Sequence, residues 1–129
     1  LVKCAKKIGV KKILIPSNTF NLTTIAKLKK FRPKFEFSYF FISKATDIPL
    51  THVDGEKHKI QGTNEKLLKI LIKTAGPKNV ILSSDCGVSI LPKPHIGFSN
   101  FINHIQKLGF SKKEIEYMIK INPKKLFNL

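Results

Sequence analysis

The sequence predicts an α/β fold in which a parallel sheet is covered by helices. Three short apolar runs suited to buried strands lie at 10–15, 35–43 and 79–84. Helical segments, in which apolar residues recur every three or four positions, come before, between and after these runs. Such alternation is typical of β/α units, in which each helix returns the chain so that the next strand runs parallel to the last.

The first elements follow from local signals. Residues 1–9 have apolar residues on one helical face and end at Gly9, which suits a left-handed helix C-cap. The strand at 10–15 stops at Pro16. A helix is expected over 21–31, with Asn21 as its N-cap.

The middle of the chain holds an aromatic-rich strand and a long loop. In 35–43 the apolar residues alternate with Glu36 and Ser38, which predicts a strand with one apolar face. Residues 44–62 follow without clear periodicity, and loops of this length are often functional. A helix is expected over 63–76 because Thr63 can cap it and Gly76 can end it.

The last third has the clearest boundaries. The strand at 79–84 is followed by a loop, and apolar spacing predicts an amphipathic helix over 97–109. Ser111 and Glu114 form a capping box for the next helix. Asn122-Pro123 is expected to end that helix and to begin a short final one.

The length of 129 residues suits one domain with a real core. Three strands cannot close an eight-stranded barrel, which needs about 200 residues or more. The residues therefore indicate either a small open α/β domain or the last three β/α units of a barrel. Because the sequence starts with Leu1 in mid-pattern, a partial domain spanning 1–129 is expected.

The net charge of +16 raises the hypothesis of nucleic-acid binding. The charge is spread evenly, at 13 bases and 4 acids in residues 1–60 against 11 bases and 4 acids in 61–129. Arg32 is the single arginine, whereas base and phosphate readers favour arginine forks. Nucleic acid is therefore not the favoured partner, and a small-molecule substrate is.

Membrane insertion and secretion are not expected. No apolar run approaches the roughly 18 to 20 residues of a membrane span, and no signal-peptide pattern is visible. Cys4 and Cys86 form no zinc or redox spacing, so buried free thiols in a reducing cytoplasm are expected. Whether the protein forms a homo-oligomer is left open.

Candidate site residues follow from the rule that ligands bind at the carboxyl ends of parallel strands. This rule places Ser17, Asn18, Ser43 and Asp85 at one edge of the sheet. A carboxylate there can bind a cation and accept a proton from a metal-bound water. The spacing alone fits a turn-capping role for Asp85 equally well. Cys86 as a nucleophile is disfavoured, because no histidine adjoins it.

Two histidines add weaker candidates. His52 lies in "THVDGEKH", a cluster of histidines and acids that matches no helical metal motif, so solvated loop residues are the more ordinary interpretation. His95 is expected in the loop over the strand edge that carries Asp85, where it either contacts substrate or is simply exposed.

The tail of the chain resembles the C-terminal end of amidohydrolase-superfamily enzymes. The resemblance rests on "VILSSDCG", the amphipathic segment after it, "GFSKKE" and "NPKKL", with Ser84, Asp85, Ser111 and Asn122-Pro123 as matching residues. It covers about 50 residues and is similar to an uncharacterised cytosolic branch of that superfamily. It implies the C-terminal three β/α units of a (β/α)8 TIM barrel with parallel strands.

The resemblance implies a metal-dependent hydrolase. Asp85 would be a ligand of a divalent metal, zinc first, and the general base for the water that attacks a carbonyl or phosphoryl centre. Ser17, Asn18, Ser43, His52 and His95 would then contact substrate. Related sequences often have a histidine where this chain has Ser17. The alternatives are therefore a catalytically degenerate barrel relative and a lysine-rich RNA-binding protein with a similar barrel.

Overall fold

The structure is a computed structural model, which describes residues 1–16, 21–42, 65–87 and 91–129. Three strands, β1 (Leu14–Pro16), β2 (Lys34–Ser38) and β3 (Val80–Ser83), form one parallel sheet in the order β1-β2-β3. The predicted α/β class with a parallel sheet is confirmed, and the arrangement is compatible with part of a barrel.

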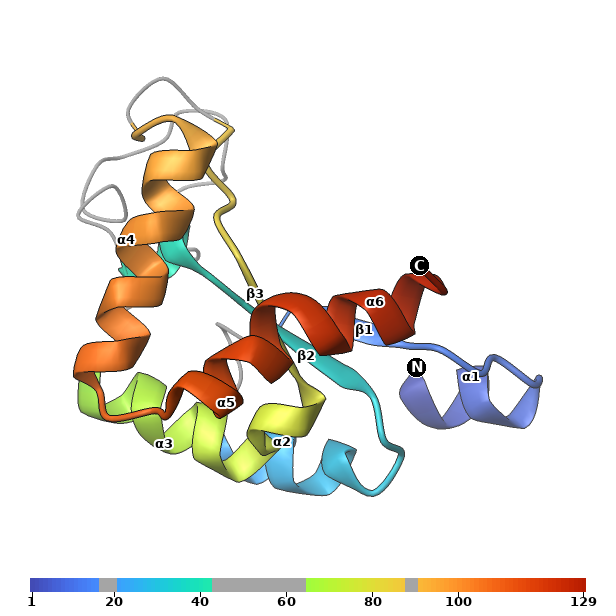
Figure 1. Cartoon of the computed structure of the whole chain (residues 1–129). Helices are drawn as coiled ribbons and strands as arrows, with labels where there is room; N and C mark the ends of the chain where they lie inside the picture. The colour runs from blue at the N-terminus through green and yellow to red at the C-terminus, as the bar shows by residue number, and fades with distance from the viewer. Residues whose placement is uncertain (17–20, 43–64, 88–90) are drawn as a thin grey trace, which may run out of the picture.

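Helices connect and cover the strands (Figure 1). They are α1 (Val2–Lys7), α2 (Leu22–Lys29), α3 (Glu65–Ala75), α4 (Pro94–Lys107), α5 (Lys112–Glu116) and α6 (Asn122–Phe127). Short 3-10 turns η1 (Tyr39–Ile42) and η4 (Pro77–Asn79) flank the strands, and a π-helical turn η5 (Tyr117–Ile121) joins α5 to α6. Because strands in sequential order are joined by crossovers of one hand, α2 and α3 lie on one face of the sheet and pack against each other.

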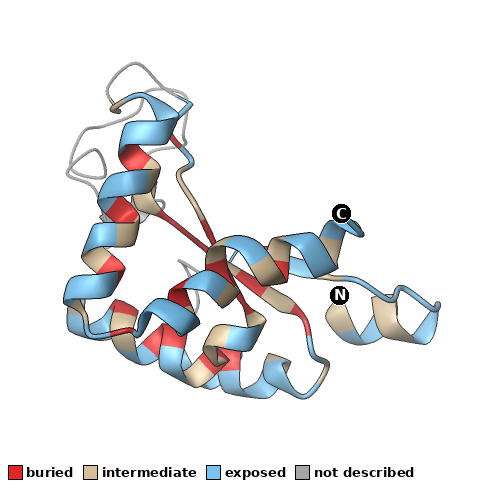
Figure 2. Ribbon diagram, viewed as in Figure 1, coloured by how far each residue is buried: buried red, intermediate tan, exposed pale blue. Residues whose placement is uncertain are grey.

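The core lies between that face of the sheet and the helices (Figure 2). The register pairs Phe35 with Val80 and Phe37 with Leu82, and all four side chains are buried in one apolar cluster. Side chains alternate along a strand, so Glu36 and its partner Ile81 lie on the other face. Ile81 is buried but does not belong to this cluster.

The helical contribution to the core comes from five elements. It consists of Ile25 in α2, Leu68, Leu71, Ile72 and Ala75 in α3, Phe101 and Ile105 in α4, and Ile115 and Met118 near the C-terminus. No helix among the described residues is long and apolar enough to cross a membrane.

Three element boundaries differ from the sequence predictions. The strand predicted at 10–15 pairs only from Leu14 onward, where β2 lies alongside it. The strand predicted at 35–43 ends at Ser38, because the chain turns at Tyr39, whose ring packs 6.3 Å from that of Phe101. The fourth helix begins at Pro94, a residue type preorganised for the first helical turn, and therefore includes His95.

The short final helix predicted to begin at Asn122-Pro123 is present as α6, but the preceding helix does not end there, because a π-helical turn continues it into α6. The π-helical turn over Tyr117–Ile121 precedes Pro123. Proline lacks an N–H and its ring collides with the carbonyl four residues earlier in a regular α-helix. The wider turn is the kind of irregularity that accommodates this.

The predicted helix caps and the predicted burial of the two cysteines can be compared with the structure. Asn21 caps α2 by accepting a hydrogen bond from Thr24 N at 2.9 Å, and Gly9 adopts φ 87°, as predicted. Cys86 is buried as expected, but Cys4 is exposed because α1 buries none of its residues.

A buried amide fixes the C-terminal helices to the sheet. Asn122 is 1% exposed, and its Nδ2 donates to Pro77 O at 2.8 Å and Val80 O at 2.6 Å. Its Oδ1 accepts from Lys34 Nζ at 3.3 Å. One side chain therefore joins α6, η4 and the first residues of β2 and β3.

Asn122→Ala is expected to lower the free energy of unfolding by about 2–4 kcal/mol, because it removes the two hydrogen bonds that a buried side chain donates to Pro77 O and Val80 O and the one that it accepts from Lys34. Urea denaturation followed by circular dichroism measures this. Asn79→Ala is the matched control, since Asn79 Nδ2 makes one bond, to Ala75 O at 3.0 Å, and a loss of about 1 kcal/mol is expected. Equal losses in both variants would contradict the role given to Asn122.

The predicted capping box is present and gives a pH-dependent contribution. Glu114 accepts from Ser111 N and from Ser111 Oγ, both at 2.8 Å, and these bonds hold the pKa of Glu114 below its ordinary value. A depressed carboxyl pKa adds stability above the unfolded-state pKa, and this stability is lost as pH falls through the folded-state pKa.

Glu114→Gln is therefore expected to be less stable than the parent chain at pH 7. The difference should shrink below about pH 4.5, where the unfolded carboxyl begins to protonate. Unfolding curves at a series of pH values measure it, with Glu116→Gln as the control for removing an exposed acid from the same helix. A difference that stays constant down to pH 2 would exclude the ionised cap as its source.

Candidate functional site

The carboxyl ends of β2 and β3 meet at one edge of the sheet. Ser38 and Ser83 are partners in the register, and Ser38 is 2% exposed. Beyond them, Phe40 N donates to Ser84 O at 3.2 Å, so the segments after the two strands remain joined. The Oγ of Ser83 is buried and has no hydrogen-bond partner in the described part of the chain. Ser83 was missed by the sequence prediction, because a serine inside an apolar run gives no signal of its own.

Asp85 lies at this edge, directly after β3. It is exposed and adopts φ 51°, in the left-handed region that non-glycine residues seldom occupy. Its neighbours are fixed on both sides, since Ser84 O accepts from Phe40 N and Cys86 is 6% exposed. The backbone around Asp85 is therefore held, while its carboxylate faces solvent.

A capping role for Asp85 would require a hydrogen bond to its carboxylate. An aspartate that caps a turn or helix accepts from a backbone N–H one to three residues further on. Within the described residues no donor reaches the carboxylate of Asp85. The next helix, α4, has Lys93 at its N-cap position. Val88, whose backbone N–H lies three residues after Asp85, is outside the described residues, so both roles that the sequence left open stay predictions.

The thiol of Cys86 is packed against α4, and its pKa is raised. Burial raises the pKa of Cys86, the bond from its Sγ to Ser84 O at 3.4 Å opposes this, and the charge of Asp85 raises it further. Because the thiolate is the nucleophile, a raised pKa makes this cysteine unreactive at neutral pH. The thiol serves instead as a contact surface for α4.

Gly97 allows α4 to approach the strand edge. A Cβ built at this position would lie 2.3 Å from Cys86 Sγ and 3.2 Å from Tyr39 Cδ1. Only a residue without a side chain lets α4 pass so close to the segments that follow β2 and β3. This contact holds the polypeptide on which Asp85 is displayed.

The remaining predicted site residues are placed as follows. His95 is exposed in the first turn of α4, not in a loop, and its carbonyl accepts from Ser99 Oγ at 2.9 Å. Ser17, Asn18, Ser43 and His52 lie outside the described residues. The structure therefore brings together Asp85 and the segments after β2 and β3, while the predicted substrate contacts stay predictions.

The His, Asp, Glu and Cys side chains of the described residues can be compared with the ligand set that a catalytic zinc requires. A catalytic zinc is held by three protein ligands, usually His, Asp, Glu or Cys. The described residues contain no group of three such side chains that could hold a metal ion. They do not by themselves fit a metal centre, and Asp85 is at most one member of a ligand set.

Comparisons with known proteins add no assignment. The chain matches no protein-family model, no curated protein and no solved structure.

Gly97→Ala is expected to lower the free energy of unfolding by about 1–3 kcal/mol, because the added methyl group overlaps Cys86 Sγ. Thermal and urea unfolding measure this. Gly87→Ala is the control, since a Cβ there meets nothing within 4 Å. Adding Cys86→Ala to Gly97→Ala should restore part of the loss, and a failure of that rescue would contradict the close contact.

Proposed function

We propose that this chain supplies the last three β/α units of an amidohydrolase-like TIM barrel and that Asp85 is the carboxylate of a hydrolytic site. The observation that supports this most directly is an exposed carboxylate just past the carboxyl end of β3, to which no donor among the described residues is bonded. In barrel enzymes the catalytic groups come from this end of the strands.

The backbone conformation of Asp85 supports the same proposal. A left-handed non-glycine residue costs of order 1–3 kcal/mol and persists where its surroundings enforce it. Such residues cluster at active sites, since the geometry of the reacting group outweighs the cost. Here the enforcing contacts are the backbone bond from Phe40 to Ser84 and the packing of Cys86 against Gly97.

The arrangement of the sheet also fits the proposal of a partial barrel. In a barrel the strands follow one another in sequence, the helices lie outside, and the opposite sheet face fills the interior. The strand order β1-β2-β3 and the common location of α2 and α3 agree with that pattern. The face that carries Glu36 and Ile81 would then be the interior face.

The proposed chemistry is hydrolysis at a carbonyl or phosphoryl centre. A divalent metal, zinc in the first instance, would supply a water of lowered pKa, about 7 in zinc hydrolases. Asp85 accepts the proton of the attacking water, for which an ionised and accessible carboxylate is required. Further ligands must come from outside the described residues. Ser17, Asn18, Ser43, His52 and His95 remain predicted substrate contacts.

Asp85→Asn tests the proposal, because asparagine also tolerates the left-handed conformation but is not a base. Hydrolysis of a panel of activated esters, amides and phosphotriesters should fall about 10²–10⁴-fold, with unfolding unchanged within about 0.5 kcal/mol. Metal content is measured in parallel by elemental analysis.

Glu116→Gln is the matched control, since Glu116 is an exposed acid of α5 whose contact is Lys120 at 3.9 Å. It should change neither activity nor metal content. Full activity and metal content in Asp85→Asn would overturn the assignment of Asp85. A protein that hydrolyses nothing in the panel and binds no metal would instead be a degenerate relative, the alternative that Ser17 raises.

A further inference from the structure

Three lysines form a stripe along α3. Lys66, Lys69 and Lys73 are spaced by three and four residues, so they lie on one side of the helix. Leu68, Leu71 and Ile72 turn to the core instead. The stripe extends over about 10 Å of helix at 1.5 Å per residue. It therefore presents a row of charges on the outer surface, not a single cluster.

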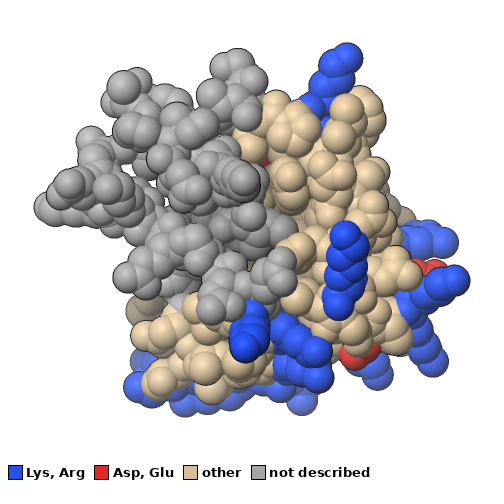
Figure 3. Space-filling view, turned by 90° about the vertical axis from the view of Figure 1, so that its left-hand side faces the viewer, with Lys and Arg blue, Asp and Glu red and all other residues tan. Residues whose placement is uncertain are grey.

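This stripe runs beside the connection between α4 and α5. A Cβ built on Gly109 would lie 3.6 Å from Lys69 Nζ, and Lys73 is close enough to contribute to the lowered pKa of Glu114. The connection adds Lys107 at the end of α4 and Lys112 and Lys113 at the start of α5, all exposed. Lysines gather along the lower margin of the molecule in Figure 3.

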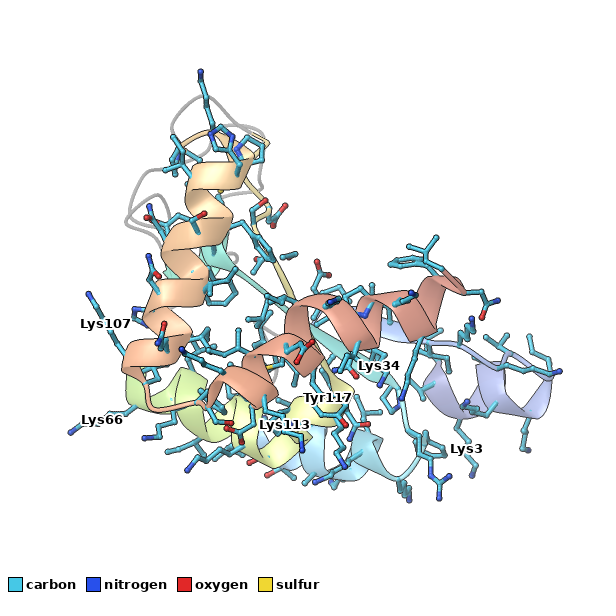
Figure 4. The ribbon with its side chains drawn as sticks, viewed as in Figure 1. Lys3, Lys34, Lys66, Lys107, Lys113 and Tyr117 are labelled. Atoms are coloured by element: carbon cyan, nitrogen blue, oxygen red, sulfur yellow. The ribbon has the colours of Figure 1, made fainter. Side chains whose placement is uncertain are left out.

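The row of lysines leads to a surface hollow. The hollow has a volume of about 440 Å³ and is lined by Gly76, Pro77, Lys78, Ser111, Lys113, Glu114 and Tyr117. Lys78 Nζ lies 5.6 Å from the centre of the half-buried Tyr117 ring. Figure 4 shows Lys113 close to Tyr117, with Lys66 and Lys107 projecting at the far end of the same side. Glu114, the acid in the hollow, is engaged by Ser111.

We propose that this basic strip, defined as Lys66, Lys69, Lys73, Lys78, Lys107, Lys112 and Lys113, binds single-stranded nucleic acid. A row of ammonium groups complements a chain of phosphates better than one isolated anion. Lysines without arginine contact phosphates as point charges and read no sequence, so binding is sequence-independent. Tyr117 offers an aromatic ring beside the phosphate contacts, the combination that single-strand binders use for stacking.

The strip is separate from the edge that carries Asp85. Lys78 and Tyr117 adjoin the start of β3, whereas Asp85 follows its end. Binding at the strip therefore does not depend on the hydrolytic site.

The test uses a fluorescent oligouridine of about 15 nucleotides and fluorescence anisotropy with the full chain at several salt concentrations. The triple variant Lys66→Gln, Lys69→Gln, Lys73→Gln should bind at least about 10-fold more weakly at about 100 mM salt. Its slope of log affinity against log salt should be smaller by about 2, since each single-strand phosphate contact contributes about 0.7.

The matched control is Lys3→Gln, Lys7→Gln, Lys11→Gln, which removes the same charge from exposed positions in and after α1. It should weaken binding less than about 3-fold. Tyr117→Leu keeps an apolar side chain and should weaken binding about 5-fold through lost stacking. Equal weakening by both triple variants, no binding by the parent chain at about 100 mM salt, or tighter binding of a duplex of the same length would overturn the proposal.

Discussion

The buried amide of Asn122 is the interaction on which the arrangement of the layers depends. It satisfies Pro77 O and Val80 O with its two N–H groups and accepts from Lys34 with its oxygen. No apolar residue of similar size could do this, because it has no N–H group to donate to these carbonyls and no oxygen to accept from Lys34. The bonds set the position of α6 over η4 and the start of β3, which in turn allows Ile115 and Met118 to close the core. The arrangement has an electrostatic cost at Lys34. Burial lowers the pKa of Lys34, and the charge of Lys125 lowers it further by a smaller amount.

The amide of Asn122 and the carboxylate of Asp85 lie at opposite ends of β3. In β/α folds the amino ends of the strands chiefly provide stability and the carboxyl ends provide ligands and catalysts. Asn122 belongs to the first kind, because all of its hydrogen bonds are used within the fold. The residues of the C-terminal tail on which the proposal rests therefore divide into two groups. "NPKKL" and the capping box account for folding, and the proposed chemistry depends on "SSD".

Local signals predicted the elements well, and tertiary contacts explain the differences. The capping box of Ser111 and Glu114 could be predicted because each partner lies three residues from the other. The end of β2 could not, because alternation continues through Phe41, and the turn at Tyr39 arises from packing against Phe101 in a helix far along the chain. Likewise, the need for Gly97 depends on Cys86, and the spacing of the two residues gives no sign of their contact. For the site, the strand-end rule placed Asp85 at the carboxyl edge of the sheet, where the structure has it, but the sequence could not show that its side chain is exposed and its backbone left-handed.

The left-handed conformation of Asp85 is distinctive when compared with the other such residues. The described residues with positive φ are Gly9, Arg32, Gly76, Asp85, Gly109 and Asn128. Five of these six follow the end of a helix, where a left-handed residue is the ordinary way to satisfy the last carbonyls. Asp85 follows a strand, so no helix terminus accounts for its conformation. Glycine would adopt that conformation without strain, yet the position holds a charged side chain directed to solvent. Aspartate is among the non-glycine residues that adopt this conformation most readily, so the conformation agrees with the proposed use of the carboxylate without requiring it.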